Sequence, residues 1–190
     1  MEIEIKIPLE TFFSTDSIIP HLYGKLGNPN AVITQIDTYF QSPIRNFWHS
    51  DEALRIRQIK SKNSTDKIEI TYKGPKQGES MKVREEISIE VSDQENSQVI
   101  LQHIGFEAVA NVKKERINWY YNNNTVVSFD KVENLGFYLE IEISSSDDVD
   151  EITKSKEKII RIAKDIIPNW NLKEERRSYL ELLILKQVNE

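Results

Sequence analysis

A strict alternation of apolar and charged residues, repeated along most of the chain, constrains the fold more than any other feature. It first occurs in EIEIK, residues 2–6, where the isoleucines fall on one face of an extended chain and Glu2, Glu4 and Lys6 on the other. Comparable alternation occurs in seven further segments, which predicts about eight β-strands. The predicted strands cover residues 2–6, 33–40, 53–57, 67–73, 81–90, 112–121, 125–132 and 138–144.

Turn residues between the strands indicate antiparallel pairing. KGPKQGES (73–80) and YNNNT (121–125) contain the glycine and asparagine that hairpin connections favour, and strands joined by short turns pair antiparallel. Helical periodicity predicts helices at residues 15–26, 92–106, 147–167 and 178–188. The second would begin with a capping box from Ser92 to Glu95 and end near Gly105, and Pro168 would stop the third.

The apolar faces of the strands and the apolar stripes of the helices require partners. If the helices cover the apolar faces and the strands curl into a barrel, the charged faces point inward. The alternative is a sheet whose charged faces lie in water, which is common for antiparallel sheets. On a face exposed to water, Thr, Ser and Gln would serve as well as charged residues. The strands instead carry paired Arg, Lys and Glu, which favours a barrel whose charged faces line an internal tunnel. We predict an α+β fold, a single domain over residues 1–190, built on an eight-stranded antiparallel barrel with helices on its outer face.

The predicted tunnel lining carries charges of both signs in near balance. Buried charges are costly without partners, so a lining of this kind requires water and a ligand. A polyphosphate with divalent cations meets this requirement, because Arg and Lys bind phosphate oxygens while carboxylates bind Mg²⁺ or Mn²⁺. The candidate lining comprises Lys6, Arg55, Arg57, Lys73, Arg84, Lys114 and Arg116 on the basic side and Glu2, Glu4, Glu86, Asp130, Glu140 and Glu142 on the acidic side.

Composition and motif content exclude several other classes of function. The chain has no cysteine, which removes disulfides, thiolate nucleophiles and zinc–thiolate sites. It has no glycine-rich P-loop, and its three histidines are not spaced as metal ligands. The net charge of −6 disfavours a nucleic-acid partner, and no apolar run approaches the length of a membrane span. We expect a cytoplasmic protein that binds neither nucleic acid nor membrane.

EIEIK is followed by seven further motifs whose order is shared with one protein family. They are QIDTYF (35–40), DEALRIR (51–57), TYKGP (71–75), VREE (83–86), KKER (113–116), SFDKVENLGFYLEIE (128–142) and RRSYLELL (176–183). The set resembles the CYTH domain superfamily, the triphosphate tunnel metalloenzymes, and EIEIK matches the Glu-x-Glu-x-Lys signature of that family. The resemblance covers nearly the whole chain and is closest to the class IV adenylate cyclases.

The resemblance implies a role for each charged position. Asp130, Lys6 and Glu86 are the catalytic candidates, and Asp130 would position the metal or activate the nucleophile. Asp37 and Tyr39 would line one mouth of the tunnel or serve the sheet structurally. The implied metal ligands are Glu2, Glu4, Glu140 and Glu142, and the implied phosphate ligands are Lys6, Arg55, Arg57, Lys73, Arg84, Lys114 and Arg116, joined by Arg176 or Arg177 from the start of the last helix.

Three functions are compatible with this lining. In an adenylate cyclase, the ribose 3′-oxygen of bound ATP attacks the α-phosphorus and pyrophosphate leaves. In a triphosphatase, water attacks a terminal phosphorus of tripolyphosphate, a nucleoside triphosphate or thiamine triphosphate. A non-catalytic polyphosphate- or nucleotide-binding module would gain nothing from four metal-binding carboxylates, which disfavours it. A homodimer formed through the helical side is compatible with the fold.

Overall fold

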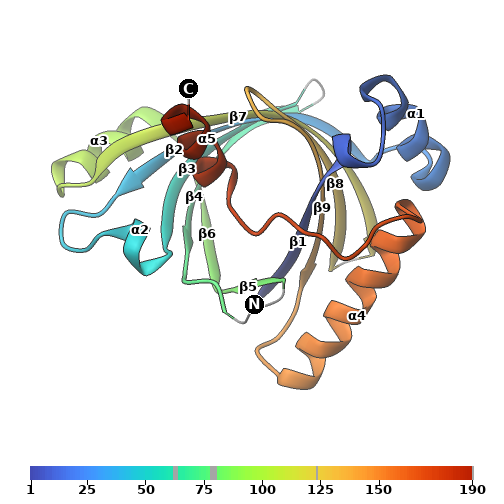
Figure 1. Cartoon of the computed structure of the whole chain (residues 1–190). Coiled ribbons are helices and arrows are strands. Elements are labelled where there is room, and N and C mark those ends of the chain that lie inside the picture. The colour runs from blue at the N-terminus through green and yellow to red at the C-terminus, as the bar shows by residue number, and fades with distance from the viewer. Residues whose placement is uncertain (62–63, 78–80, 123, 190) are drawn as a thin grey trace.

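A single curved antiparallel sheet forms the centre of the computed structural model, which describes residues 1–61, 64–77, 81–122 and 124–189 (Figure 1). The strands follow the order β5-β1-β9-β8-β7-β2-β3-β4-β6, and all neighbours pair antiparallel. The predicted nearly closed antiparallel barrel is confirmed. The strands are β1 Glu2–Pro8, β2 Ala31–Gln41, β3 Ala53–Ser61, β4 Ser64–Lys73, β5 Lys82–Arg84, β6 Glu86–Val91, β7 Glu107–Asn122, β8 Thr125–Val132 and β9 Gly136–Ser144.

The described strands number nine where eight were predicted, because the predicted strand at 81–90 divides at Glu85. Its first part, β5, pairs with β1, whereas its second part, β6, pairs with β4. The backbone N–H of Gly74 donates to the Glu85 carbonyl at 3.0 Å and holds the point of division. Both ends of the sheet therefore belong to one short stretch of chain, which brings the two edges together and nearly closes the barrel.

The predicted helices form close to their expected bounds. Asp93 is the N-cap of α3, since its carboxylate accepts from the Asn96 N–H at 2.9 Å, so the predicted capping box at Ser92 is wrong. Gly105 follows α3 with a φ of 95°, which glycine adopts without strain. The helices are η1 Leu9–Thr11, α1 Thr15–Leu26, α2 Phe47–Ser50, α3 Gln94–His103, α4 Val149–Ile166 and α5 Tyr179–Asn189.

The main core lies between the outer face of the sheet and two helices, α1 and α4 (Figure 1). Isoleucines of β1 and β9 face outward and are fully buried, as the alternation predicted. At about 25 cal/mol per Å², each stabilises the fold by roughly 1.5–3 kcal/mol. The buried strand residues are Ile3, Ile5, Ile7, Val127, Phe129, Leu139, Ile141 and Ile143, and they pack with Ile18, Leu22, Ile159, Ala163 and Ile166 of the helices.

Helix α5 departs from the predicted arrangement because it lies against the inner face of the sheet. Tyr179 and Leu180 pack on Tyr39 and Tyr138, which belong to the same strand faces as the tunnel charges. The prediction that the helices pack on the outer face is therefore wrong for α5. The inner face becomes apolar toward one end of the barrel, where it offers α5 a partner and lets the helix cover the tunnel (Figure 1).

β7 and β8 form a hairpin as expected, whereas residue 123 of its turn and residues 78–80 of the other predicted connection lie outside the described residues. None of the helices in the described part of the chain combines the length and apolarity needed to cross a membrane.

Candidate functional site

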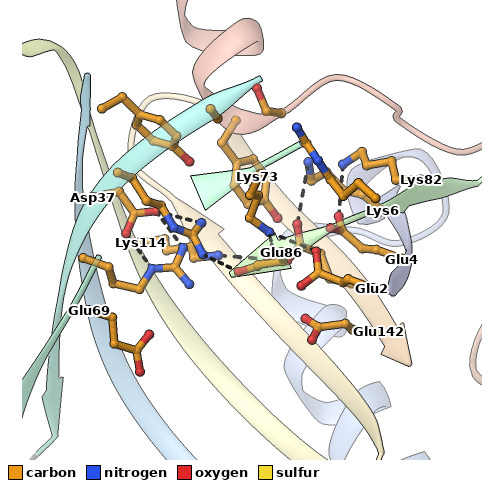
Figure 2. A pocket seen from close by; sticks show the side chains of 18 of the residues that line it. Glu2, Glu4, Lys6, Asp37, Glu69, Lys73, Lys82, Glu86, Lys114 and Glu142 are labelled. Atoms are coloured by element: carbon orange, nitrogen blue, oxygen red, sulfur yellow. Dashed lines mark hydrogen bonds and ion pairs between the residues drawn. The ribbon is translucent and has the colours of Figure 1, made fainter. Parts of the chain in front are cut away.

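The inner face of the sheet and the start of α5 enclose a cavity of about 190 Å³ (Figure 2). Fifteen of its 19 lining residues are charged, and cations outnumber carboxylates by eight to seven. Tyr39, Ala53, Ser178 and Tyr179 complete the lining. The charged residues are Lys6, Arg55, Arg57, Lys73, Lys82, Arg84, Lys114 and Arg116 with Glu2, Glu4, Asp37, Glu69, Glu86, Glu140 and Glu142.

Asp130 on β8 lies behind this lining and is fully buried. Its carboxylate accepts hydrogen bonds from Lys114 Nζ at 2.9 Å, from Arg116 Nε at 2.6 Å and from the Tyr179 hydroxyl at 2.9 Å. Both carboxylate oxygens are therefore occupied. The structure places Asp130 beneath the cavity wall rather than in the lining, where the sequence had predicted it.

Glu140 on β9 joins the same group of ions from inside the cavity. It accepts a hydrogen bond from Arg116, and its carboxylate lies 3.6 Å from Lys6 Nζ and 4.0 Å from Lys114 Nζ. Burial would raise the pKa of Glu140, but these cations lower it well below its ordinary value. Glu140 is thus held ionised by three neighbours.

Lys6 on β1 is buried next to α5. Its ammonium donates to the Arg177 carbonyl at 2.9 Å and lies 4.1 Å from the centre of the Tyr179 ring. Burial and the nearby Lys82 lower the pKa of Lys6 to about 7, although Glu140 and Glu4 oppose the shift. A lysine with such a pKa exchanges its proton near neutral pH, which is a property of catalytic lysines.

Asp37 on β2 holds two arginines of β3 in place. Its oxygens accept from Arg57 Nε and Nη2, both at 2.6 Å, and one lies 3.5 Å from the Arg55 guanidinium. Burial would raise the pKa of Asp37, but the two arginines lower it far below the ordinary value. The Nε of Arg55 is buried and has no hydrogen-bond partner among the described residues. Asp37 thus fixes Arg55 and Arg57 in the lining of the cavity.

Lys73 on β4 bridges two carboxylates across the gap between the edges of the sheet. Its ammonium donates to Glu2 at 2.9 Å and also to Glu86 (Figure 2). Although burial opposes ionisation, contacts from Glu2, Lys73 and Arg55 lower the pKa of Glu86 to about 2. Burial and the Glu86 carboxylate raise the pKa of Glu2. Glu86 therefore remains ionised and anchors cations.

Besides Glu140, three glutamates face the cavity from the adjacent strands β1 and β9: Glu2, Glu4 and Glu142. Glu4 lies opposite Glu142 in the strand register and pairs with Lys82 at 3.0 Å, while Glu142 has no ion pair within the described structure. Burial, together with the charges of Glu2 and Glu4, raises the pKa of Glu142 to about 8. Several carboxylates that lie this close together repel one another, and their oxygen atoms are suitable ligands for a hard divalent cation.

The glutamate side chains are nevertheless directed at lysines in this structure. In the residues described, no three Asp, Glu or His side chains converge with the geometry of a metal site. Glu2 and Glu4 each engage a lysine, and Glu140 is surrounded by cations. The donor set therefore fits Mg²⁺ or Mn²⁺ in its chemistry, and it would have to leave the lysines before it could converge on a cation.

Arg84 on β5 differs from the other cations of the lining. Its Nε donates to the Gly74 carbonyl at 2.8 Å and its Nη2 to the Asp51 carbonyl at 3.0 Å. Among the described residues it forms no salt bridge, so its charge is not neutralised by a carboxylate. Arg84 is thus prepared to receive anionic oxygens.

The structure brings together the predicted residues, with two exceptions. Asp130 lies behind the wall, and the half-buried Arg176 is not part of the lining. The Arg177 side chain is exposed and pairs with Glu175, so this segment meets the tunnel through its backbone and through Tyr179. Lys82, Glu69 and Tyr179 also line the cavity and were not among the predicted site residues. Alternation places Lys82 and Glu69 on the charged faces of their strands, whereas no periodic signal points to Tyr179.

Fold and site together define a class of protein, an antiparallel barrel that turns a balanced set of charges toward an internal cavity. The family model of the CYTH domain matches residues 1–178, and the chain belongs to this family.

Three relatives illustrate the range of the likeness. The putative adenylate cyclase MJ0240 of Methanocaldococcus jannaschii is 36% identical over 151 residues, which cover 78% of this chain and 80% of that protein. The PH1819 protein of Pyrococcus horikoshii superposes with a TM-score of 0.85 at 35% identity, covering 98% of this chain and 99% of that one. A putative adenylyl cyclase from Hippeastrum, described as having a dominant triphosphatase activity, shares the fold with a TM-score of 0.63 at 18% identity over 99% and 96% of the two chains.

Proposed function

We propose that the tunnel binds a triphosphate together with Mg²⁺ or Mn²⁺ and converts it, with ATP cyclisation to cyclic AMP as the reaction. The observation that carries this proposal is the set of eight cations around one cavity, of which Arg84 has no carboxylate partner among the described residues. A triphosphate supplies the negative charge that Arg84 lacks. The name of the Methanocaldococcus relative supports the cyclase reaction.

Binding would occur as an exchange of ion pairs. Lys73 and Lys82 now neutralise Glu2 and Glu4 at 2.9 and 3.0 Å. When phosphate oxygens enter, the lysines would turn to them, and Glu2, Glu4 and Glu142 are the residues that would then hold a divalent cation. The exchange keeps every buried charge compensated, which the low dielectric of the cavity demands. We assign Glu140 to fixing Lys6 and Arg116, because three cations already surround it.

Different side chains of the tunnel bind the phosphates, accept a proton and hold other side chains in position. Arg55, Arg57, Arg84 and Arg116 orient the phosphates and stabilise charge that develops on their oxygens. A bound divalent cation would lower the pKa of the attacking hydroxyl and neutralise the leaving group. Lys6, with a pKa of about 7, is the group suited to accept the proton of the nucleophile. Asp130 holds Lys114 and Arg116, and Glu86 holds Lys73 and Arg55.

Hydrolysis of a triphosphate is the second candidate. The lining contains only Tyr39, Ala53, Ser178 and Tyr179 besides its 15 charged residues, so the cavity itself offers little surface to a nucleobase. A substrate that is all phosphate, such as tripolyphosphate, would use every contact. The Hippeastrum protein, whose fold is similar, has triphosphatase activity by its description.

Product analysis distinguishes these reactions. The pure protein is incubated with ATP, tripolyphosphate or thiamine triphosphate and Mg²⁺ or Mn²⁺, and the products are separated. Cyclic AMP with pyrophosphate supports the cyclase, orthophosphate supports the triphosphatase, and binding without product supports a non-catalytic module.

A matched pair of variants tests the metal assignment. Glu4→Gln should abolish metal-dependent turnover because it removes a cation ligand, whereas Glu115→Gln, an exposed neighbour of Lys114, should leave turnover unchanged. Full activity of Glu4→Gln would contradict the assignment.

A further inference from the structure

A groove of about 50 Å³ adjoins the charged cavity and is lined by residues of α2 and of the start of α5. Several residues line both spaces, so the groove continues the cavity past its wall. The shared residues are Tyr39, Ala53, Arg84 and Ser178, and the groove adds the apolar side chains of Phe47, Trp48 and Leu180. A molecule whose charged part fills the cavity would therefore have an apolar surface next to it.

Trp48 provides the largest apolar surface of this groove. The chain has three tryptophans, and Trp119 and Trp170 are buried in the core, whereas Trp48 is 43% exposed. The Asn46 side chain accepts a hydrogen bond from the Trp48 backbone N–H at 2.9 Å, which fixes the start of α2. An exposed indole beside a cavity that is suited to anions is a stacking surface for a planar aromatic ring.

The rim of the groove carries carboxylates that have capacity for further hydrogen bonds. Lys76 Nζ donates to Asp51 at 2.8 Å and to Glu181 at 3.2 Å, and thereby joins the end of α2 to α5. Both carboxylates remain partly exposed, and a carboxylate accepts more than one hydrogen bond. The rim therefore favours a ring that has an amino group as donor over a ring that offers only carbonyl oxygens.

We propose that this groove binds the aromatic base of a nucleoside triphosphate, with the base stacked on Trp48 and its amino group donating to Asp51 or Glu181. The inference rests on the proposed function and narrows the substrate to a triphosphate that carries an amino-substituted base, as ATP does. Arg84 lines both spaces, so it is the cation placed to hold the phosphate nearest the base. Ala53 has the smallest side chain of the shared residues and leaves the passage between the two spaces open.

Calorimetric titration with ATP and with tripolyphosphate tests this site, with Ca²⁺ in place of Mg²⁺ to slow turnover. Trp48→Ala should raise the dissociation constant of ATP by about 10-fold or more, because base–aromatic stacking is lost. The same variant should leave the dissociation constant of tripolyphosphate unchanged, because tripolyphosphate has no base. Trp48→Phe keeps an aromatic ring and should retain most of the affinity for ATP. Tyr121→Ala, at an exposed tyrosine of β7, is the matched control and should change neither constant.

Tryptophan fluorescence gives a readout of the contact itself. ATP should quench the emission of the wild type more than that of Trp48→Phe, in which Trp119 and Trp170 are the remaining tryptophans. Tripolyphosphate should not produce this difference. Inosine triphosphate has a carbonyl oxygen in place of the amino group of adenine and should bind more weakly than ATP. Equal affinities for the two nucleotides would contradict the role of Asp51 and Glu181.

The outcomes separate the base site from the tunnel assignment. If the wild type binds both ATP and tripolyphosphate and Trp48→Ala weakens both equally or neither, the base site is overturned and the tunnel assignment stands. If the wild type binds neither ligand, the proposed function fails and the base site fails with it. Circular dichroism verifies that each variant is folded, which we expect because the Trp48 side chain is not part of either core cluster.

Discussion

Replacing Glu142 by glutamine should make the protein more stable at alkaline pH, although it removes a group from the candidate site. The pKa of Glu142 is raised from 4.5 to about 8 by burial and by the charges of Glu2 and Glu4. Between these pH values the unfolded chain has lost a proton that the folded protein retains, so the free energy of unfolding falls as pH rises and levels off above pH 8. The difference between the two pKa values corresponds to about 5 kcal/mol of unfolding free energy in total, of which about 2–3 kcal/mol is lost between pH 6 and 8.5.

Thermal unfolding of the wild type and Glu142→Gln at pH 6 and pH 8.5, without divalent cations, measures this contribution. The variant should gain up to about 5–10 °C relative to the wild type on going to pH 8.5. The wild type must be compared with the variant because Lys6 has the opposite effect on stability. The pKa of Lys6 is lowered to about 7 in the folded protein, whereas the unfolded chain keeps this proton up to about pH 10.5. This contribution raises the free energy of unfolding of both proteins as pH rises from 6 to 8.5. An equal change in both proteins would refute the electrostatic reasoning at Glu142.

Two further predictions concern the buried group around Asp130. Asp130→Asn should lower the free energy of unfolding by about 3 kcal/mol or more, because Lys114 and Arg116 lose their shared counter-charge in a buried position; urea denaturation measures this, and an unchanged midpoint would show that the cations are compensated otherwise. Tyr179→Phe should cost about 1 kcal/mol through loss of the hydroxyl bond to Asp130 while keeping the aromatic contact with Lys6. Tyr121→Phe, at a tyrosine that is 46% exposed, is the matched control, and an equal effect of both changes would contradict a special role for the Tyr179 hydroxyl.

Alternation allowed the inner and outer faces of the strands to be predicted because a residue's side of a sheet depends only on its parity along the strand. Lys114 and Arg116 could therefore be assigned to the cavity with Glu140 from the sequence. The parity of a residue does not indicate, however, how deeply its side chain is buried. Asp130 has the parity of a lining residue, yet hydrogen bonds from three side chains hold it beneath the cavity surface.

Features that depend on contacts between distant segments could not be predicted from local patterns. The division of the 81–90 strand at Glu85 depends on a bond to Gly74 and on the two different partners of its halves. The position of α5 depends on Tyr39 and Tyr138. Both tyrosines lie on the same strand faces as the charged residues, so alternation does not distinguish them. The pairing of Lys73 with Glu2 likewise depends on which edges of the sheet meet.

The bond from Lys6 to the Arg177 carbonyl joins segments separated by 171 residues and has a consequence for the order of folding. Closing so long a loop is entropically costly, so this contact is expected to form late, after neighbouring strands have paired. Until α5 arrives, the charged faces of the strands can remain hydrated. The chain would thus assemble its sheet while its charges are still in water and dehydrate them only when their partners are in place.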